Sequence, residues 1–537
     1  MPTVETERVP QVAAAPASFP LQKLNIDIML TIFTALLASP DSSPTSPVTL
    51  SQVCRSWRDL FLESPTLWTN ILVSEELSTT NASLDRAYKR VEAYLARSGG
   101  CSLAIQLSFV TWGPQESTEQ PEDSPYYHTL PAFFHRLNDI GRAIAKHAAR
   151  IRTFSLTVDE MECTAAVLGG FGLAKMPLLE AWTVRNTDEE QVSDNPPNNP
   201  DALLAEQKEM EAHYALCHPE SLIMNHDKVA SLYSNLRFLS LHTTPLVWSE
   251  FCPRNLVTLE ITMLPLVHRP SSADLCHILL ANAHSLESLR LDGCVSPDSE
   301  WPESCLVPNV EFLQLGFYKS CELLPLLNAI QVPALRRFVL TDIHRQRKDP
   351  SERLLSQFDE DIILVLRAIG DKLPIHEIWH AQFEHIALCP SSHQIPLDEA
   401  ENALKLARRF TVKFFSGWKK LTHLFLHGPD RATLEGLNSI LPCSMEMHGT
   451  TEPRVPAPAL TTLQVENCVA SVLGSFLRIR VAHPQSFHAL LGLVIKMPRN
   501  WFDAVKWDTR NLTVLAKEVF PIYTQLSPEV QTELLQL

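Results

Sequence analysis

The chain has 537 residues, of which 45% are hydrophobic and 20% charged, and its formal net charge is −16. This composition excludes a chain that is disordered throughout, because there is enough apolar material for a substantial core. The acidic balance argues against general nucleic-acid binding, which requires a basic surface. The sequence also lacks the G-x-x-x-x-G-K-[ST] phosphate loop and the G-x-S-x-G nucleophile elbow, which mark two large classes of enzyme.

The first 18 residues lack a basic start followed by an apolar run, so we expect a disordered lead-in rather than a secretory signal. No apolar run reaches the roughly 18 residues of a membrane span. The twelve cysteines are scattered, and the nearest pair, Cys294 and Cys305, is eleven residues apart. This spacing does not fit a zinc finger or ribbon and favours reduced thiols. We therefore expect a cytoplasmic and/or nuclear protein with no membrane and no nucleic-acid partner.

Residues 24–71 predict short amphipathic helices. Apolar residues recur four apart in a first stretch and again at helical spacing after a Ser/Pro-rich break, which places each set on one helix face. The two sets are Leu24, Ile28, Ile32 and Leu36 with Phe33 beside them, and then Leu50, Val53, Cys54, Trp57 and Leu60. Pro65 and Trp68 close the unit. So small a unit makes a poor core of its own and is better suited to docking on a partner.

These residues resemble an F-box in the form common in large fungal F-box families. The family pattern is roughly Leu-Pro-x-Glu-Ile-Leu-x-x-Ile-Phe, then Val-Cys-x-x-Trp, then Pro-x-Leu-Trp. The matching residues are Leu24, Asp27, Ile28, Ile32 and Phe33, then Val53, Cys54 and Trp57, then Pro65, Leu67 and Trp68. Asp27 replaces Glu, and Asn25, which can cap the helix that follows, stands where the family has Pro. The break between the helices, Ser39–Pro47, is longer than usual.

The resemblance implies an all-α F-box over residues 19–72 that docks on a Skp-type adaptor and, through it, on a cullin. The adaptor contacts that it implies are Leu24, Ile26, Ile28, Ile32, Phe33, Val53, Trp57 and Leu60. Cys54 holds a core position of the family, so we expect a buried thiol and not a nucleophile. Trp57 and Trp68 fit interface anchors and packing centres equally well.

Residues 73–150 are expected to contain linking helices and a first strand. One helix is predicted over Ser83–Ser98, where two glycines end it, and a second over roughly 130–149. Between them, apolar residues alternate as in a half-buried strand. The alternating residues are Leu103, Ile105, Leu107 and Phe109.

One short phrase then recurs over residues 151–480: an apolar residue, two others, an apolar residue, one other, and an apolar residue. Nine copies occur, and the starts from Leu236 to Leu335 are separated by 20, 30, 24 and 25 residues. This is the L-x-x-L-x-L strand pattern of leucine-rich repeats. The copies begin at Ile151, Leu179, Leu236, Leu256, Leu286, Val310, Leu335, Leu421 and Leu460. The expected fold is α/β: a short all-α F-box followed by an irregular leucine-rich-repeat solenoid, with parallel strands and outer helices.

Ordinary strands of a non-repetitive α/β fold are the alternative to a solenoid. Polar or charged stretches near 185–219, 344–361 and 443–458 interrupt the series and are expected to be loops, either ligand-facing or simply disordered. Residues 481–537 are expected to cap the last repeat, since an open solenoid end exposes apolar surface.

The segment from His376 to His380 reads His-Glu-Ile-Trp-His, which matches the H-E-x-x-H signature of zinc proteases. There, two histidines on a helix bind zinc while the glutamate activates water. We interpret the segment as a strand, because Ile375 and Ile378 fall where a repeat strand would place them. On a strand, the two histidines would be about 13 Å apart, too far for one ion. His376 and His380 therefore remain weak metal candidates.

The leading functional hypothesis is the substrate-recognition subunit of a Skp–cullin–F-box ubiquitin ligase, with the repeat region holding an unknown target protein. Such a chain performs no bond chemistry and needs no cofactor, so we do not expect an enzyme. A repeat scaffold outside any ligase is the second hypothesis, and a zinc hydrolase built on His376 and His380 is a remote third.

Overall fold

The structure is a computed structural model of the chain. It describes residues 24–37, 46–77, 81–111, 125–159, 161–171, 174–187, 233–296 apart from 245 and 247, 301–347 apart from 303, 362–388, 397–439 apart from 438, 456–466 and 492–496. Within these residues, no helix combines the length and apolarity needed to cross a bilayer. The predicted lead-in and most of the three predicted loops lie outside the described residues. Of the predicted C-terminal cap, residues 481–537, only 492–496 are described, and they form a further strand of the sheet.

The described chain begins with three short helices and a single 3-10 turn. They are α1 (Ile26–Leu37), α2 (Ser46–Val53), α3 (Arg55–Glu63) and η2 (Pro65–Trp68). Asn25 caps α1, since its side-chain Oδ1 accepts a hydrogen bond from the Asp27 amide at 3.2 Å. The single second helix expected around Trp57 is instead two helices. Cys54 separates them because its backbone is extended, with φ −155° and ψ 169°.

Thirteen parallel strands follow in one sheet, and their order in the sheet is their order in the chain. The α/β prediction is confirmed. The strands are β1 (Asn70–Leu77), β2 (Leu103–Thr111), β3 (Ile151–Val158), β4 (Ala181–Asn186), β5 (Phe238–His242), β6 (Thr258–Thr262), β7 (Ser288–Asp292), β9 (Phe312–Phe317), β11 (Arg337–Asp342), β12 (His380–Glu384), β13 (His423–His427), β14 (Thr462–Glu466) and β15 (Gly492–Lys496). Two shorter strands, β8 (Cys305–Leu306) and β10 (Ile330–Gln331), pair separately.

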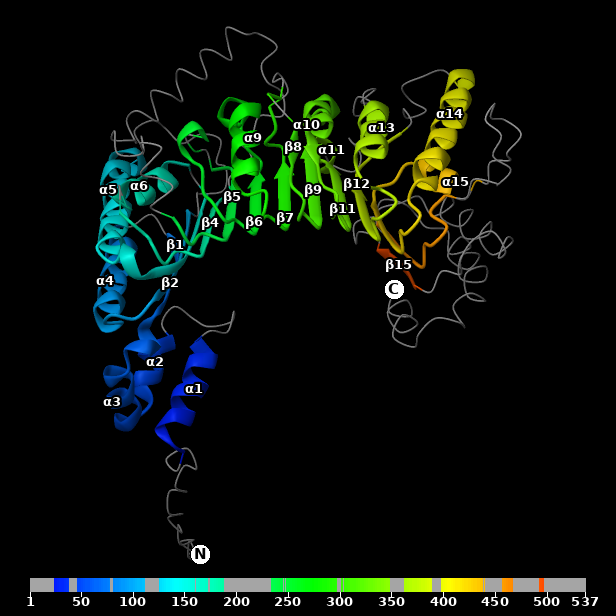
Figure 1. Cartoon of the computed structure of the whole chain (residues 1–537). Helices are drawn as coiled ribbons and strands as arrows, with labels where there is room; N and C mark the ends of the chain where they lie inside the picture. The colour runs from blue at the N-terminus through cyan, green and yellow to red at the C-terminus, as the bar shows by residue number, and fades with distance from the viewer. Residues whose placement is uncertain are drawn as a thin grey trace, which may run out of the picture.

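The sheet curves into an arch, with its strands on the inner side and helices along the outer side (Figure 1). The helices are α4 (Asn81–Arg97), α5 (Pro125–Ala145), α6 (Met161–Phe171), α9 (Ser272–Ala281), α10 (Leu323–Ala329), α11 (Ile343–Arg347), α13 (Ile362–Lys372), α14 (Leu397–Ser416) and α15 (Arg431–Leu437). The helices α1–α3 lie below one end of the arch (Figure 1). A parallel neighbour in chain order requires a crossover outside the sheet, which is why helices alternate with strands.

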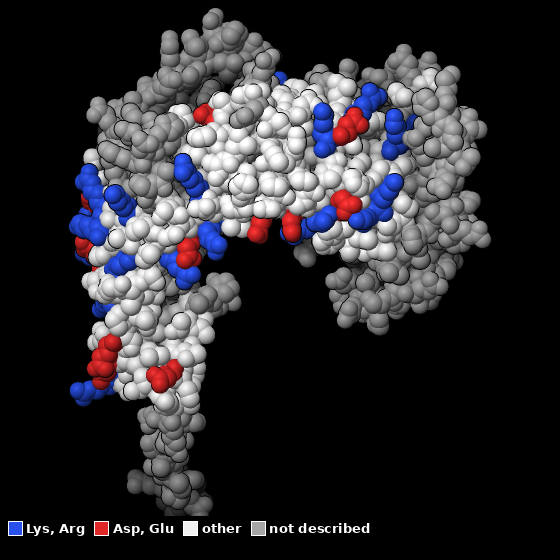
Figure 2. Space-filling model, in the orientation of Figure 1, with Lys and Arg blue, Asp and Glu red and all other residues white. Residues whose placement is uncertain are grey.

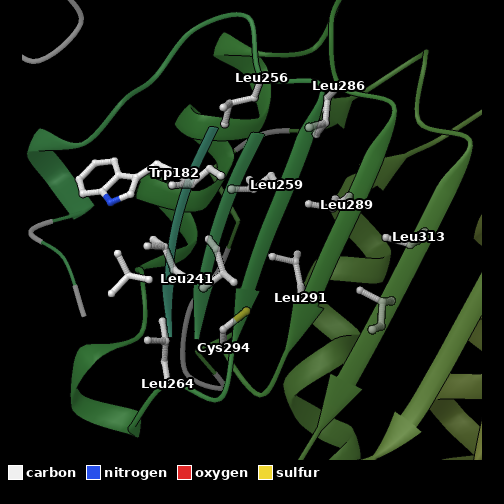
Figure 3. Close-up of a cluster of buried hydrophobic side chains, with 14 of the residues drawn as sticks. Trp182, Leu241, Leu256, Leu259, Leu264, Leu286, Leu289, Leu291, Cys294 and Leu313 are labelled. Carbon is white, nitrogen blue, oxygen red and sulfur yellow. The ribbon is translucent and has the colours of Figure 1, made fainter. Parts of the chain in front are cut away.

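The apolar residues of the repeated phrase form the core between sheet and helices. In all nine copies the second and third apolar residues lie on a strand of the sheet. Leu239 and Leu241 on β5 are in register with Leu259 and Ile261 on β6, and all four are buried. Figure 3 shows the same stacking over β4 to β9. The apolar residues of each strand are therefore buried only because those of the neighbouring strand pack beside them.

Backbone geometry repeats at the carboxyl ends of the strands. Five residues that directly follow a strand have φ between +49° and +60°, and each amide donates to a carbonyl of the next strand at 2.6–2.9 Å. They are Thr243, Met263, Gly293, His385 and Gly428. The left-handed conformation turns the chain out of the sheet while keeping that amide paired. The repeat is therefore regular in backbone although its spacing in sequence is not.

Two sequence interpretations differ from the structure. The strand β1 was not predicted, so the sheet already begins at residue 70, in the stretch assigned to the F-box and its linker. The strand near Trp379 begins at His380. Its residues that face the core between sheet and helices are Ala381 and Phe383 rather than Ile375 and Ile378. A small alanine in the place of a leucine hides this copy of the phrase.

Candidate functional site

Helix α1 is apolar on two adjacent sides. Met29, Phe33 and Leu37 face the interior and are buried. Ile28, Ile32 and Leu36 recur one turn apart on another side, and each is 47–49% exposed. A surface helix of a free-standing protein ordinarily places polar residues there. The sequence prediction of a single apolar face is therefore wrong in one respect: Phe33 belongs to the inner side and Ile28 and Ile32 to the outer.

The remaining predicted adaptor contacts divide by exposure. Ile26 and Val53 are exposed, at 61% and 60%, whereas Leu24, Trp57 and Leu60 are half-buried against the core. Leu62 on α3 is also exposed and was not among the predicted contacts. Leu36 was placed on the apolar face of α1 from the sequence but was not among the predicted contacts either. The term outer apolar set is used below for Ile26, Ile28, Ile32, Leu36, Val53 and Leu62.

An aromatic chain joins α1–α3 to the sheet. The ring of Phe33 lies 4.7 Å from Trp57 and 5.1 Å from Phe61, between ring centroids. Trp68 continues this chain to Tyr94 on α4 at 5.1 Å and donates from Nε1 to the Phe61 carbonyl at 2.7 Å. These rings belong to one buried cluster that extends into the sheet. Helices α1–α3, which bear the outer apolar set, are thus packed against the arch.

Cys54 is exposed, so the prediction of a buried thiol is wrong. Its Sγ accepts a hydrogen bond from the Trp57 amide at 3.5 Å and caps α3. The Cys-x-x-Trp spacing accounts for this contact, because a cap side chain reaches the amide three residues later. Cys54 therefore stabilises the start of α3 as a capping residue and is not part of the core.

The inner face of the sheet is a second candidate surface. Alternate residues of each strand point away from the leucine core, and the described ones are mostly half-exposed and polar. Carboxylates recur there at Glu260, Asp292, Glu384 and Glu466. In Figure 2, acidic and basic side chains lie together along the lower rim of the arch. The middle of the surface above that rim is largely uncharged, and further charged side chains lie at the upper right.

Asp292 is the most enclosed of these carboxylates, with a side chain only 4% exposed. Its Oδ2 accepts from Arg290 Nε at 2.6 Å and from Gln314 Nε2 at 2.8 Å. Burial raises the pKa of Asp292, and this outweighs the opposing effect of the Arg290 guanidinium. Asp292 therefore has a structural role on the inner face, where it holds the side chains of Arg290 and Gln314 in place.

The His-Glu-Ile-Trp-His segment does not form the helix that a zinc protease requires. His376 lies in a turn after α13, and His380 is the first residue of β12. Glu377 is bonded by Lys420 Nζ at 2.7 Å and Arg336 Nη1 at 3.2 Å. The hydrogen bond from Lys420 lowers the pKa of Glu377, which is the wrong direction for a general base. Nowhere in the described residues do three or more His, Cys, Asp or Glu come together as metal ligands.

One cysteine lies near a histidine. Cys252 Sγ is 3.9 Å from His277 Nε2. Burial raises the pKa of the Cys252 thiol, which disfavours the thiolate that a nucleophile needs. The pair does not have the electrostatics of an activated nucleophile.

Comparison of the chain with models of known protein families and with curated proteins finds no match. The candidate surfaces are therefore judged on their own geometry and chemistry.

Proposed function

We propose that this chain is the substrate receptor of a Skp–cullin–F-box type ubiquitin ligase. In this proposal α1–α3 form an F-box that docks on a Skp-type adaptor. The arch is an irregular leucine-rich-repeat solenoid whose inner face holds the target protein. Bond chemistry belongs to other subunits, and this chain acts as a receptor.

The observation that carries the proposal is the outer apolar set. Six large aliphatic side chains on α1–α3 are 47–61% exposed, although the same helices bury other apolar residues. Covering one such side chain with a partner contributes on the order of 1 kcal/mol. Three of them, Ile28, Ile32 and Leu36, lie one turn apart along one side of α1, and exposed apolar rows of this kind mark protein–protein interfaces.

The repeated backbone geometry supports the solenoid. At eight successive junctions from β4 to β14, two consecutive amides donate to the carbonyl of the residue just before the preceding strand, at 2.7–3.3 Å. The chain order of the strands and the outer helices agree with stacked repeats, in which each unit buries its core only against its neighbours. The aromatic chain from Phe33 to Tyr94 would hold the docking unit in a set orientation to the arch.

The test is adaptor binding by the full chain. Ile28→Asp combined with Ile32→Asp places charges on the outer side of α1, where neither residue supports the core. We expect at least a tenfold loss of adaptor affinity in a pull-down or calorimetric titration, because more than about 1.4 kcal/mol of apolar contact is removed. Thermal unfolding should be nearly unchanged.

Leu406→Asp is the matched control, since Leu406 is at least as exposed, at 65%, but lies on α14 at the far end of the arch. It should bind the adaptor like the unaltered chain. Retained adaptor binding by the double variant would overturn the docking proposal. Adaptor binding without a cullin in the same complex would instead favour a repeat scaffold that stays outside the ligase.

A further inference from the structure

The inner face of β9–β13 has a row of basic and aromatic side chains at the amino-terminal edge of its strands. Each member is the first residue of its strand and is directly followed by a buried core residue, so the row faces away from the core. The members are in register on neighbouring strands, and we call them the basic row: Phe312, Arg337, His380 and His423. Arg337 and His423 are exposed, and the other two are half-buried. A partner within the arch can therefore reach the row.

Arg337 supplies a fixed positive charge that is held on a ring. Its guanidinium carbon lies 5.3 Å from the centroid of the Phe312 ring. A guanidinium stacked on a ring keeps its N–H groups at its edge, where they can bind a carboxylate or a phosphate through two parallel hydrogen bonds. Arg337 forms no ion pair with a described residue, in contrast to Arg290, which is bonded to Asp292. It is therefore available to an anion from outside the chain.

The two histidines of the row lie face to face. Their rings are stacked, 6.0 Å apart with an angle of 22° between the planes. The Thr422 hydroxyl donates to the Trp379 carbonyl at 3.0 Å, so its oxygen accepts from His423 Nδ1 at 2.9 Å. This leaves His423 Nε2 as the position that takes up a proton. Burial lowers the pKa of His380, and the positive charges of His423 and Arg337 lower it further, so His380 is mostly neutral at pH 7.

The acidic residues around the row leave room for an anion. Glu384 and Glu466 are on the same face but four residues further along the strands, about 13 Å away, which exceeds the screening length of about 8 Å at physiological salt. Glu311 is exposed directly before β9, and its carbonyl accepts from the Arg337 amide at 2.9 Å, so its charge is near enough to weaken anion binding. The turns that lead into β11, β12 and β13 have one further cluster of charged and titratable groups: Arg336, His376, Glu377 and Lys420.

We propose that the basic row binds an acidic segment of the target protein, with one anionic side chain on Arg337 and a second on the stacked histidines. Two strand spacings, about 10 Å, separate the strands of Arg337 and His423, and an extended chain covers that length in three residues. Two acidic side chains within about four positions therefore reach both contacts. The second anion favours a proton on His423 Nε2, so binding should tighten as pH falls. That this segment belongs to a ubiquitination target rests on the proposed function.

Charge favours a short acidic protein segment over a nucleic acid. A nucleic acid would bring a continuous series of phosphates along the inner face, where Glu384 and Glu466 would repel them, and the whole chain has a net charge of −16. A protein segment with two acidic residues places its negative charge on the basic row alone.

The experiment uses the full chain and a phage-displayed library of random 12-residue peptides, selected at about pH 6.5. Enriched peptides should share two Asp or Glu residues within about four positions. Fluorescence polarisation then measures the affinity of an enriched peptide. Arg337→Gln should weaken binding about tenfold, because a guanidinium–carboxylate pair is lost. Glu311→Gln should strengthen binding about twofold, because a repelling charge is removed.

The pH dependence of peptide affinity tests the histidines separately from the arginine. The unaltered chain should bind the peptide about fivefold more tightly at pH 6 than at pH 8. His423→Asn should lose most of this dependence, whereas Arg337→Gln should keep it. An unchanged pH dependence in His423→Asn would overturn the assignment of the second anion to the histidines.

Arg185→Gln is the matched control, because it removes an exposed arginine from β4, several strands away from the row. It should leave peptide affinity unchanged. The proposal is overturned if enriched peptides are basic or purely apolar, or if no peptide is enriched. It is also overturned if Arg185→Gln acts as strongly as Arg337→Gln, or if a single-stranded oligonucleotide binds as tightly as the peptide.

Replacing one acidic residue of the enriched peptide by phosphoserine identifies the anion. Tighter binding assigns the site to a phosphorylated segment and weaker binding to a carboxylate-bearing one, and either result supports an anion site. Ile28→Asp with Ile32→Asp should abolish adaptor binding and leave peptide binding intact, so failure of the docking proposal is read out separately.

Discussion

At the scale of single residues, the left-handed position that follows five of the strands is the most demanding site in the fold. Gly293 has φ +58°, and a Cβ there would lie 2.6 Å from the Tyr318 ring and 3.1 Å from Ile343. Gly293→Ala should therefore lower the free energy of unfolding by about 2 kcal/mol or more, from backbone strain and the clash together. Urea denaturation measures this. Gly100→Ala, with no atom within 4 Å, is the control and should be neutral.

Asp292 gives a prediction on pH. Because burial raises its pKa in the folded chain, the folded state keeps the proton to a higher pH than the unfolded state does. Its contribution to stability is therefore lost as pH rises from about 4 upward. Asp292→Asn removes this loss, so the variant should gain stability relative to the unaltered chain between pH 4 and pH 8. Urea midpoints across that range test it, with the exposed Asp371→Asn as control. A constant or shrinking difference would contradict it.

At the scale of elements, α3 depends on a cap that is easily altered. Cys54→Ser keeps an acceptor at the cap and should preserve or slightly raise stability. Cys54→Ala removes the acceptor and should lower the free energy of unfolding by up to about 1 kcal/mol.

Because Cys54 is exposed, iodoacetamide should label it rapidly in the native chain. Cys294 should stay unlabelled, since it is buried and burial raises the pKa of its thiol. Peptide mass spectrometry distinguishes the two, and slow labelling of Cys54 would argue against its exposed position.

At the scale of the whole molecule, contacts run between neighbouring units, and this predicts local rather than global loosening. Trp68→Ala interrupts the aromatic chain that joins α1–α3 to the sheet. It should lower the free energy of unfolding by about 3–5 kcal/mol. Hydrogen exchange should then accelerate in α1–α3 while β9 and β11 stay protected. Trp418→Ala is the matched substitution at the other end, where the ring packs on Phe338 and Phe383. It should accelerate exchange around β12 and β13 and leave α1–α3 protected. Equal acceleration of hydrogen exchange along the whole chain would contradict the prediction that each unit is stabilised only by its neighbours.

The sequence by itself determined the fold class and most of the strands. Each copy of the repeated phrase places two apolar residues on the same side of a strand, and this period of two survives irregular spacing between copies. It placed the strand near Trp379 too early, because Ala381 takes the place of a leucine in β12. It did not predict β1, which directly follows the 3-10 turn at Trp68, or β15, which lies in the predicted cap. It also named Ile28, Ile32 and Val53, which are exposed, because aliphatic residues at helical spacing are visible in sequence.

Only the tertiary structure decided which apolar residues are available to a partner. Phe33 and Ile32 are adjacent in sequence and equally apolar, yet one packs on Trp57 and the other faces outward. Their exposure depends on where α2 and α3 lie, which local spacing does not encode. The contact between the Trp379 and His423 rings has the same origin: the two residues are 44 positions apart in the chain and meet because β12 and β13 pair in register. Long-range strand pairing, and not local pattern, brings those side chains together.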